Sequence, residues 1–311
     1  MAQTTTKSTR TTKPKTSAHI SRKSHAHQNL KKQPHHHKDP LSTLLRASVF
    51  VAITLTGGVF VLLVGYILYS GLPHLSASLF EWKYTTQNVS MLPALINTIT
   101  IVALSLLCSA PVAILGAVYL QEYAKSDSWI VGAINLAAET LAGIPSIVYG
   151  LFGFIVFVMY VFDNTYTMLA GAFTLSIMVL PLILRNTQEA LKCVPVSYKE
   201  AGFGLGAPKL VVLFKIILPC AMSGVLAGVI LAIGRIISES AALLYTAGSV
   251  AQVAGALDSG RTLSVHLYQL LNEGLYIEQA AASAVVILLI VIMLNILSNV
   301  VAKKLSPSMP A

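Results

Sequence analysis

Charged side chains are scarce in this sequence. They make up 11% of the 311 residues, whereas hydrophobic residues make up 55% and the mean hydropathy is +0.73. A soluble domain of this size carries about a quarter of its residues as Asp, Glu, Lys or Arg. The scarcity of charge therefore argues against a soluble globular enzyme.

Cysteine and the common catalytic motifs are also rare. Cys108, Cys193 and Cys220 lie far apart with no CxxC pair, so we expect buried, reduced thiols rather than a disulfide framework or a metal site. The sequence contains no HExxH and no GxSxG, which ranks an intramembrane enzyme last among the functions considered. The glycine-rich run 202–209 lacks the Gly-Lys-Ser/Thr ending of a P-loop, and no Walker A motif occurs elsewhere in the sequence.

Acidic residues are nearly missing from the first 46 positions, which hold ten Lys/Arg and the single acid Asp39. The remaining residues are neutral in sum, so the net charge of +9 belongs to this tail and does not indicate a nucleic-acid partner. Residues 1–43 contain too few aliphatic side chains to offset their ordering entropy, which predicts a disordered tail. Its histidines, among them 35–37, favour a solvated polar segment over a metal-binding tract.

Long runs without any charged residue dominate the rest of the chain. The runs 47–80 and 84–121 each exceed the ~20 apolar residues that a membrane-spanning helix needs, and they predict spans near 47–70 and 93–120. Four further spans are predicted from the charge-free runs 140–162, 164–184, 216–234 and 279–302. The predicted fold class is therefore an all-α integral membrane protein with about six transmembrane helices.

The apolar segment 240–257 is rich in Ala, Gly and Ser, and three interpretations of it stay open. It extends the fifth span, or it forms a re-entrant segment, or it lies at the membrane surface.

The loops between the predicted spans have a clear charge asymmetry. With the N-terminus in the cytoplasm, six crossings place 18 Lys/Arg inside and only Lys83 and Arg261 outside. This is the distribution that the positive-inside rule describes. We therefore expect a multi-pass protein, surrounded by membrane lipid, with both termini in the cytoplasm.

The cytoplasmic loop before the fifth span has structure signals of its own. Ser197 and Glu200 have the spacing of a capping box, which predicts a helix that starts there. Glycines between 202 and 206 would end this helix, and Pro208 suits the first turn of a second helix that runs to Pro219. Such a bent pair of helices serves either as a docking element or as an amphipathic linker at the membrane surface.

The same loop resembles the EAA loop of ABC importer permeases. The spacing Glu-Ala-Gly, three residues, Gly, nine residues, Ile, one residue, Leu-Pro is formed by Glu200, Ala201, Gly202, Gly206, Ile216, Leu218 and Pro219. Only Gly202 departs from the family pattern, which usually has Ala there. In that family the loop is the coupling helix that fits a groove on the ATPase subunit, and the resemblance implies this role here. It covers about 93–302 and implies a type I (MetI-like) permease core.

Within this family, the segments 141–150 and 234–242 resemble PstA-type permeases of bacterial phosphate importers, as does the additional span ahead of the core. The resemblance implies a location in the bacterial inner membrane. It further implies three partners: a second, homologous PstC-like permease, a dimer of PstB-like ATPase subunits and an external phosphate-binding protein. We expect no cofactor in this chain, because ATP with Mg would be hydrolysed by the partner subunit.

Few charged residues are predicted to lie in or near the membrane. Arg235 and Glu239 are four positions apart, hence on one helical face, and Arg235 falls in the outer half of the bilayer. A charge there costs several kcal/mol unless it is paired or faces a cavity, and the guanidinium fork suits a tetrahedral oxyanion. The resemblance implies a transport role for both residues; a structural ion pair is the alternative. Arg185, with Glu189 at i+4, is a second candidate for the substrate path, or else an anchor of the helix end at the inner surface.

These expectations divide the chain into four parts: a tail at 1–43, an extra first helix with an outer loop at 44–92, a permease domain at 93–303 with the coupling loop 185–218, and a C-terminal tail at 304–311. The predicted function is that of a permease subunit in an ATP-driven phosphate importer. A permease for another oxyanion (sulfate, molybdate or phosphonate) and a self-contained channel or secondary carrier are the alternatives.

Overall fold

The computed structural model describes residues 40–125 and 128–305, and every regular element in these ranges is helical. The predicted tails at 1–39 and 306–311, with the histidine-rich tract, lie outside the described residues. Contacts divide the chain into two units, 1–61 and 62–311, and the helix α1 (Pro40–Gly71) runs across the division. This 32-residue helix begins at Pro40, within the predicted N-terminal tail, and it is long enough to cross a bilayer.

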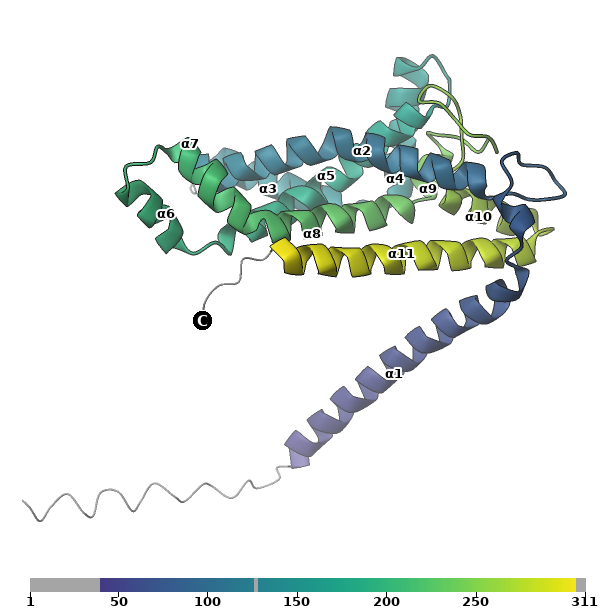
Figure 1. Cartoon of the computed structure of the whole chain (residues 1–311), viewed down its shortest axis with the longest axis horizontal. Helices are drawn as coiled ribbons and strands as arrows, with labels where there is room; N and C mark the ends of the chain where they lie inside the picture. Colours follow the sequence, from purple (N-terminus) through teal and green to yellow (C-terminus); the bar gives the residue numbers. More distant parts are fainter. Residues whose placement is uncertain (1–39, 126–127, 306–311) are drawn as a thin grey trace, which may run out of the picture. The chain divides into compact units, whose positions relative to one another are not determined.

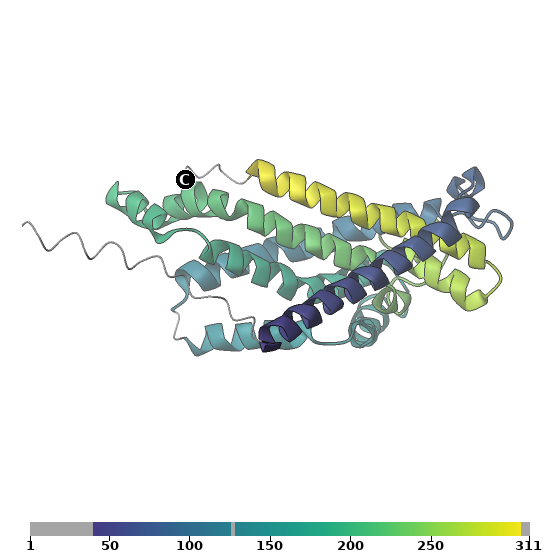
Figure 2. The ribbon, with the colours of Figure 1, turned by 90° about the horizontal axis from the view of Figure 1, so that it is seen from below.

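The second unit is a bundle of long apolar helices around α5 (Met168–Lys192), as Figures 1 and 2 show. α5 packs against α2 (Leu92–Val118) and α8 (Leu218–Ile237), and α11 (Ile277–Leu305) packs along α8. Two thirds (67%) of the most apolar window of α5 is buried, against 22–33% for α2, α8 and α11, so α5 is the centre of the bundle. The core between these helices is formed by buried aliphatic side chains, including Ile101, Leu175, Val179, Ile183 and Ile236.

The predicted third span, 140–162, corresponds to the second part of a broken helix. α3 (Trp129–Ala142) and the following α4 (Ser146–Gly153), which continues as the π-helix η4 (Phe154–Val161), are bent by 102° at a short break. Pro145 stands at the N-cap of α4, where its fixed φ starts a new helix instead of continuing the old one. Five helices are long and apolar enough to cross a membrane, or six if the bent pair counts as one span, in line with the predicted number.

A different pair of short helices lies at each end of this bundle (Figure 1). One end carries α6 (Val196–Gly204) and α7 (Lys209–Val212), and the other carries α9 (Ala241–Leu244) and α10 (Leu263–Glu273). The short 3-10 helices η1 (Leu72–His74) and η2 (Ala77–Phe80) follow α1. Because α8 ends at Ile237 and α9 is a separate buried turn, segment 240–257 does not extend the fifth span.

Two local predictions about the loop helices are wrong. α6 begins at Val196 after Pro195 and its N-cap has no side-chain hydrogen bond, so Ser197 already lies in the first turn and forms no capping box. The second helix does not stop at Pro219: α7, the π-helix η5 (Leu213–Ile217) and α8 form one span from Lys209 to Ile237. Proline is tolerated there because it falls in the first turn of α8, directly after the π-helical segment.

Candidate functional site

The predicted pair of Arg235 and Glu239 forms at the end of α8. The Arg235 Nη2 atom lies 3.7 Å from Glu239 Oε2. The Glu239 carboxylate is almost fully buried (6% exposed), whereas the Arg235 side chain is half exposed (51%). Glu239 is fixed in place, because its Oε1 accepts the backbone N–H of Ala242 at 3.3 Å and its carbonyl accepts the hydroxyl of Ser264 at 2.5 Å. The pair therefore joins one fixed acid to one cation that remains accessible.

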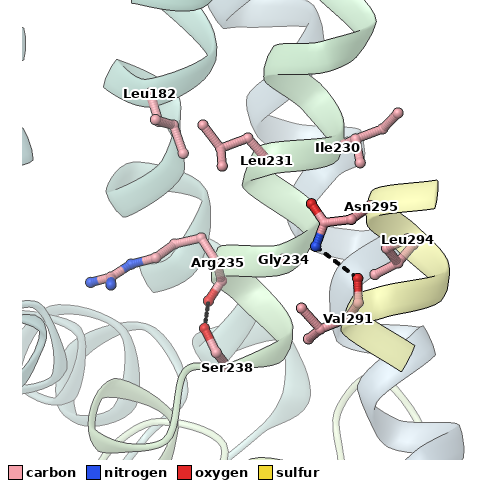
Figure 3. A pocket seen from close by; sticks show the side chains of 9 residues that line it. All are labelled: Leu182, Ile230, Leu231, Gly234, Arg235, Ser238, Val291, Leu294 and Asn295. Carbon is pink, nitrogen blue, oxygen red and sulfur yellow. Dashed lines mark hydrogen bonds between the residues drawn. The ribbon is translucent and has the colours of Figure 1, made fainter. Parts of the chain in front are cut away.

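Arg235 also lines a cavity of about 440 Å³ between α5, α8 and α11 (Figure 3). The lining residues are Leu182, Ile230, Leu231, Gly234, Arg235, Ser238, Val291, Leu294 and Asn295. Two of the polar side chains are occupied: the Ser238 hydroxyl donates to the Arg235 carbonyl at 3.1 Å, and the Asn295 amide donates to the Val291 carbonyl at 2.9 Å. Arg235 is the one charged residue in this largely apolar lining, and Figure 3 shows its side chain extending away from Asn295 and α11.

Arg185 does not pair with Glu189 as its spacing suggested. Its Nη2 atom lies 3.6 Å from Glu139 Oε2 on α3, a residue to which the sequence assigned no role. Glu189 instead accepts from Lys192 at 2.8 Å, one turn further along α5. Both Arg185 and Glu139 are well exposed, and Leu182, not Arg185, lines the Arg235 cavity. The structure therefore does not bring the two predicted path arginines into one pocket.

The EAA-like residues lie where α6 turns back onto the fifth span. A Cβ atom on Gly202 would come within 2.9 Å of Val212 and 3.0 Å of Ile216, so only a glycine lets α6 approach this closely without a shift. Gly206 has φ = +78°, the left-handed conformation that glycine adopts without strain. The two glycines thus set the close approach of the helices and the turn between them, here called the elbow (205–208).

The other motif residues divide into an exposed and an internal set. Glu200 and Ala201 are exposed on α6 and are free to meet another surface. Ile216 and Leu218 pack against the cluster that includes Leu191 and Ile217, which ties the loop to the end of α5. Pro219 is exposed at the start of α8.

Asn97 is a central residue that the charge-based prediction missed. Its amide nitrogen donates to the carbonyls of Gln252 (2.8 Å) and Arg261 (3.0 Å), and its amide oxygen accepts the N–H of Ala254 (2.9 Å). The adjacent Thr98 hydroxyl accepts the N–H of Leu263 at 2.9 Å. These two polar residues near the start of a span organise the whole loop between α9 and α10. A buried Asn-Thr pair in an apolar run was the available signal, since buried polar groups need partners.

Arg261 is predicted to lie in an outer loop, and the structure buries it together with His266 of α10. The Arg261 guanidinium stacks over the Tyr84 ring at 4.4 Å, and His266 meets the same ring edge-to-face at 6.2 Å. Burial, together with the smaller effect of the nearby Arg261 charge, lowers the pKa of His266 to about 3. His266 is therefore a neutral core residue.

The sequence of this chain is similar to those of known transport proteins. Residues 110–310 match the family model described as "Binding-protein-dependent transport system inner membrane component". The chain is 29% identical over 264 residues to the probable ABC transporter permease protein YqgI of Bacillus subtilis, covering 78% of this chain and 87% of that protein.

Two further relatives carry the name of phosphate transport system permease proteins. Identity is 39% to PstA 2 of Mycobacterium bovis, covering 54% of this chain and 57% of that protein. It is 36% to PstA of Pasteurella multocida, covering 57% of this chain and 63% of that protein. The chain thus spans about 60% of the length of these PstA relatives.

Solved structures share the fold at low sequence identity. A chain of a bacterial alginate ABC transporter superposes with a TM-score of 0.59 at 16% identity, covering 86% of this chain and 99% of that chain. A chain of the MetNI methionine ABC transporter superposes with a TM-score of 0.55 at 18% identity, covering 69% and 94%. These likenesses confirm the predicted all-helical, MetI-like fold.

Proposed function

The chain belongs to the family of binding-protein-dependent transport system inner membrane components, and from this premise we propose that it forms part of the path of inorganic phosphate. It is a multi-pass permease subunit of an ABC importer, a family that has no ATPase activity of its own. The prediction that the chain is not an enzyme is thereby confirmed. Phosphate as the substrate, the roles of single residues and the particular partners belong to the proposal.

The observation that carries the proposal is the half-exposed guanidinium of Arg235, which is the one charged residue in the lining of a largely apolar cavity. Arginine keeps its charge at any physiological pH and donates two parallel hydrogen bonds to an oxyanion. Buried Glu239 holds this cation when no anion is present, at a 3.7 Å separation that is long for a direct hydrogen bond. An arriving phosphate can therefore replace the carboxylate as the partner of Arg235. The two PstA-named relatives support phosphate as the anion.

An energy source follows from the charge of the substrate. Moving one negative charge inward against 100 mV costs about 2.3 kcal/mol, and a divalent phosphate costs about twice that. Permeases of this family work with ATPase subunits and an external binding protein. For this chain we assign a second, PstC-like permease, a dimer of PstB-like ATPase subunits and a phosphate-binding protein as partners, with ATP and Mg held by the ATPase.

The ATPase would dock on α6. Glu200 and Ala201 are exposed there, together with the apolar side chains of Phe203 (48% exposed) and Leu205 (90% exposed). Exposed apolar groups next to an acidic residue are typical of a protein interface rather than of a loop facing water alone. We assign this end of the bundle and both termini to the cytoplasm, which the charge asymmetry of the loops supports.

The test is uptake by the reconstituted importer, with all subunits and the binding protein in liposomes. Arg235→Gln should abolish phosphate uptake while the complex still co-purifies, because the anion loses its only charged partner in the cavity lining. Lys83→Gln removes an equal charge at an exposed position and serves as the matched control. Unimpaired uptake by Arg235→Gln would remove this residue from the path.

The same system tests the substrate and the docking. An Arg fork suits any tetrahedral oxyanion, so transport of sulfate, molybdate or phosphonate in place of phosphate would replace the substrate assignment. Gly206→Leu forces a left-handed φ on a residue that resists it, and should uncouple ATP hydrolysis from uptake. Uptake by this chain alone, without ATPase, would instead favour a channel or carrier.

A further inference from the structure

Both short helices of the cytoplasmic loop contact the same end of α2. The Lys199 ammonium on α6 lies 2.5 Å from the Glu122 carboxylate, and the Lys209 ammonium on α7 lies 4.2 Å from the centre of the Tyr123 ring. Glu122 and Tyr123 belong to the π-helix η3 (Tyr119–Tyr123), which continues α2. Two consecutive residues at the end of α2 thus each contact one lysine: Glu122 contacts Lys199, before the elbow, and Tyr123 contacts Lys209, after it.

The Lys199–Glu122 pair differs from the other ion pairs of this region in its burial. The Glu122 side chain is 9% exposed and that of Lys199 is 24% exposed, whereas the Lys192–Glu189 pair is 52% and 70% exposed. Exposed pairs contribute little because water and salt screen them. Removing one partner of a buried pair leaves an uncompensated charge, and the structure must move to solvate it. The position of α6 therefore depends on Lys199–Glu122 and not on Lys192–Glu189.

The pair also sets which face α6 presents outward. Adjacent residues on an α-helix project about 100° apart, so holding Lys199 against α2 directs Glu200 to the exposed side. Gly202 at the same time packs against Val212 and Ile216. α6 is thus held by close packing on one span and by charge on another.

We propose that Lys199 and Glu122 are positioning residues that carry the displacement of the coupling loop into α2. This inference rests on the proposed function, in which an ATPase moves α6. Through its own chain connections the loop is joined to α5 and, across the elbow, to α8. The pair adds α2, which packs against both of these helices, so that one displacement of α6 moves three spans together. Without the pair, α6 loses its charged contact with α2, and less of the displacement of α6 would reach this span.

The test compares ATP hydrolysed per phosphate imported by the full complex in proteoliposomes. Lys199→Met and Glu122→Gln should raise this ratio several-fold while the ATPase still co-purifies, with the larger effect for Lys199→Met because it leaves Glu122 buried and unpaired. The double variant with Lys199→Glu and Glu122→Lys should bring the ratio back toward that of the wild type. Lys192→Met breaks the exposed pair of the same loop and should leave the ratio unchanged.

The outcomes separate this inference from the function on which it rests. A wild-type ratio in both single variants overturns the role of the pair and leaves the proposed function standing. A wild-type chain that neither binds nor stimulates the ATPase overturns both. If Lys199→Met prevents assembly, the charge-swapped variant decides: recovered coupling supports the direct pair, and failure to recover overturns it.

Discussion

Different interactions hold the elements together at the two ends of the bundle. At the end with α6 and α7, contacts between elements far apart in the sequence include charged side chains, among them Lys199–Glu122 and Arg185–Glu139. At the end with α9 and α10, side-chain amides and hydroxyls bind backbone groups, with Asn97 making three such bonds. Backbone N–H groups at the start of α5 also donate to carbonyls of the loop after α9.

This difference indicates at which end of the bundle the helices can move relative to one another. An ion pair between two helices tolerates changes of distance and angle, whereas a hydrogen bond weakens steeply as its geometry changes. The end with α9 and α10 therefore resembles a fixed frame, and the end with α6 and α7 resembles a set of helices linked through their side chains. The following changes test this contrast, from the largest expected effect to the smallest.

Asn97→Leu should destabilise the frame most strongly. The change leaves the N–H of Ala254 and the carbonyl of Arg261 buried without their partner, at about 1–3 kcal/mol each. We expect the midpoint of thermal unfolding in detergent to fall by many degrees. Thr100→Val is the control, because that hydroxyl bonds only within its own helix, to the Ile96 carbonyl. Equal shifts for both variants would contradict a frame centred on Asn97.

Gly202→Leu should act at the other end, on docking more than on the fold. Its side chain would meet Val212 and Ile216, and overpacking of this kind costs about 1–3 kcal/mol. α6 can yield by moving away from η5, so we expect weaker co-purification of the ATPase with a modest loss of stability. Gly204→Ala, where nothing lies within 4 Å of the added Cβ, should retain binding. Equal binding by both variants would show that the close approach at Gly202 does not matter for docking.

His266→Phe should change how the stability of the frame depends on pH. The pKa of His266 is about 3 in the fold, below its usual value of about 6.5, so below pH ~6.5 the unfolded chain binds a proton that the fold excludes. The contribution of His266 to the free energy of unfolding is therefore fully present above pH ~6.5 and is lost as the pH falls toward 3. As the pH is lowered from 8 to 4, the midpoint of thermal unfolding should fall less steeply for His266→Phe than for the wild type. Parallel curves would contradict the burial of His266.

Arg185→Gln should have the smallest effect on stability. Its pair with Glu139 is 3.6 Å long and both side chains are exposed, so we expect a change of about 0–1 kcal/mol. Glu139→Gln should match it in thermal unfolding. A difference in phosphate uptake between these two variants would then report on Arg185 in the substrate path. Equal uptake would reduce Arg185 to a surface contact of α3.

The spans were predictable because the membrane imposes a simple rule on sequence. A helix in lipid needs an unbroken apolar run, and helices 92–118 and 277–300 coincide closely with the predicted spans 93–120 and 279–302. Helix 168–192 continues eight residues past the predicted end at 184, because its last two turns leave the apolar run. The turn at Gly206 was predictable for a local reason as well, because a left-handed φ favours glycine, whereas the close approach at Gly202 comes from packing and was not predicted.

The partners of the charged residues were not predictable in the same way. The i+4 spacing gave Arg235–Glu239, but Arg185 and Lys199 pair with residues 46 and 77 positions away, and only the packing of the bundle decides such contacts. The capping box at Ser197 failed because Pro195 starts the helix first. The 102° bend had a signal in Pro145, but its angle depends on the tertiary contacts of α3 and α4.

The continuous helix from Lys209 to Ile237 gives the molecule a lever arm. Nineteen residues separate Ile216 beside the elbow from Arg235 beside the cavity, a length of about 28 Å. Tilting such a rod by about 10° around its cytoplasmic end displaces the far end by roughly 5 Å. Arg235 and Glu239 lie at this far end, where the Glu239 N–H donates to the carbonyl of Ile236 in the rod and its carboxylate accepts the N–H of Ala242 beyond the rod. A small rotation at the site of docking would thus displace the charged residue of the cavity by several ångströms while the helix between them stays intact.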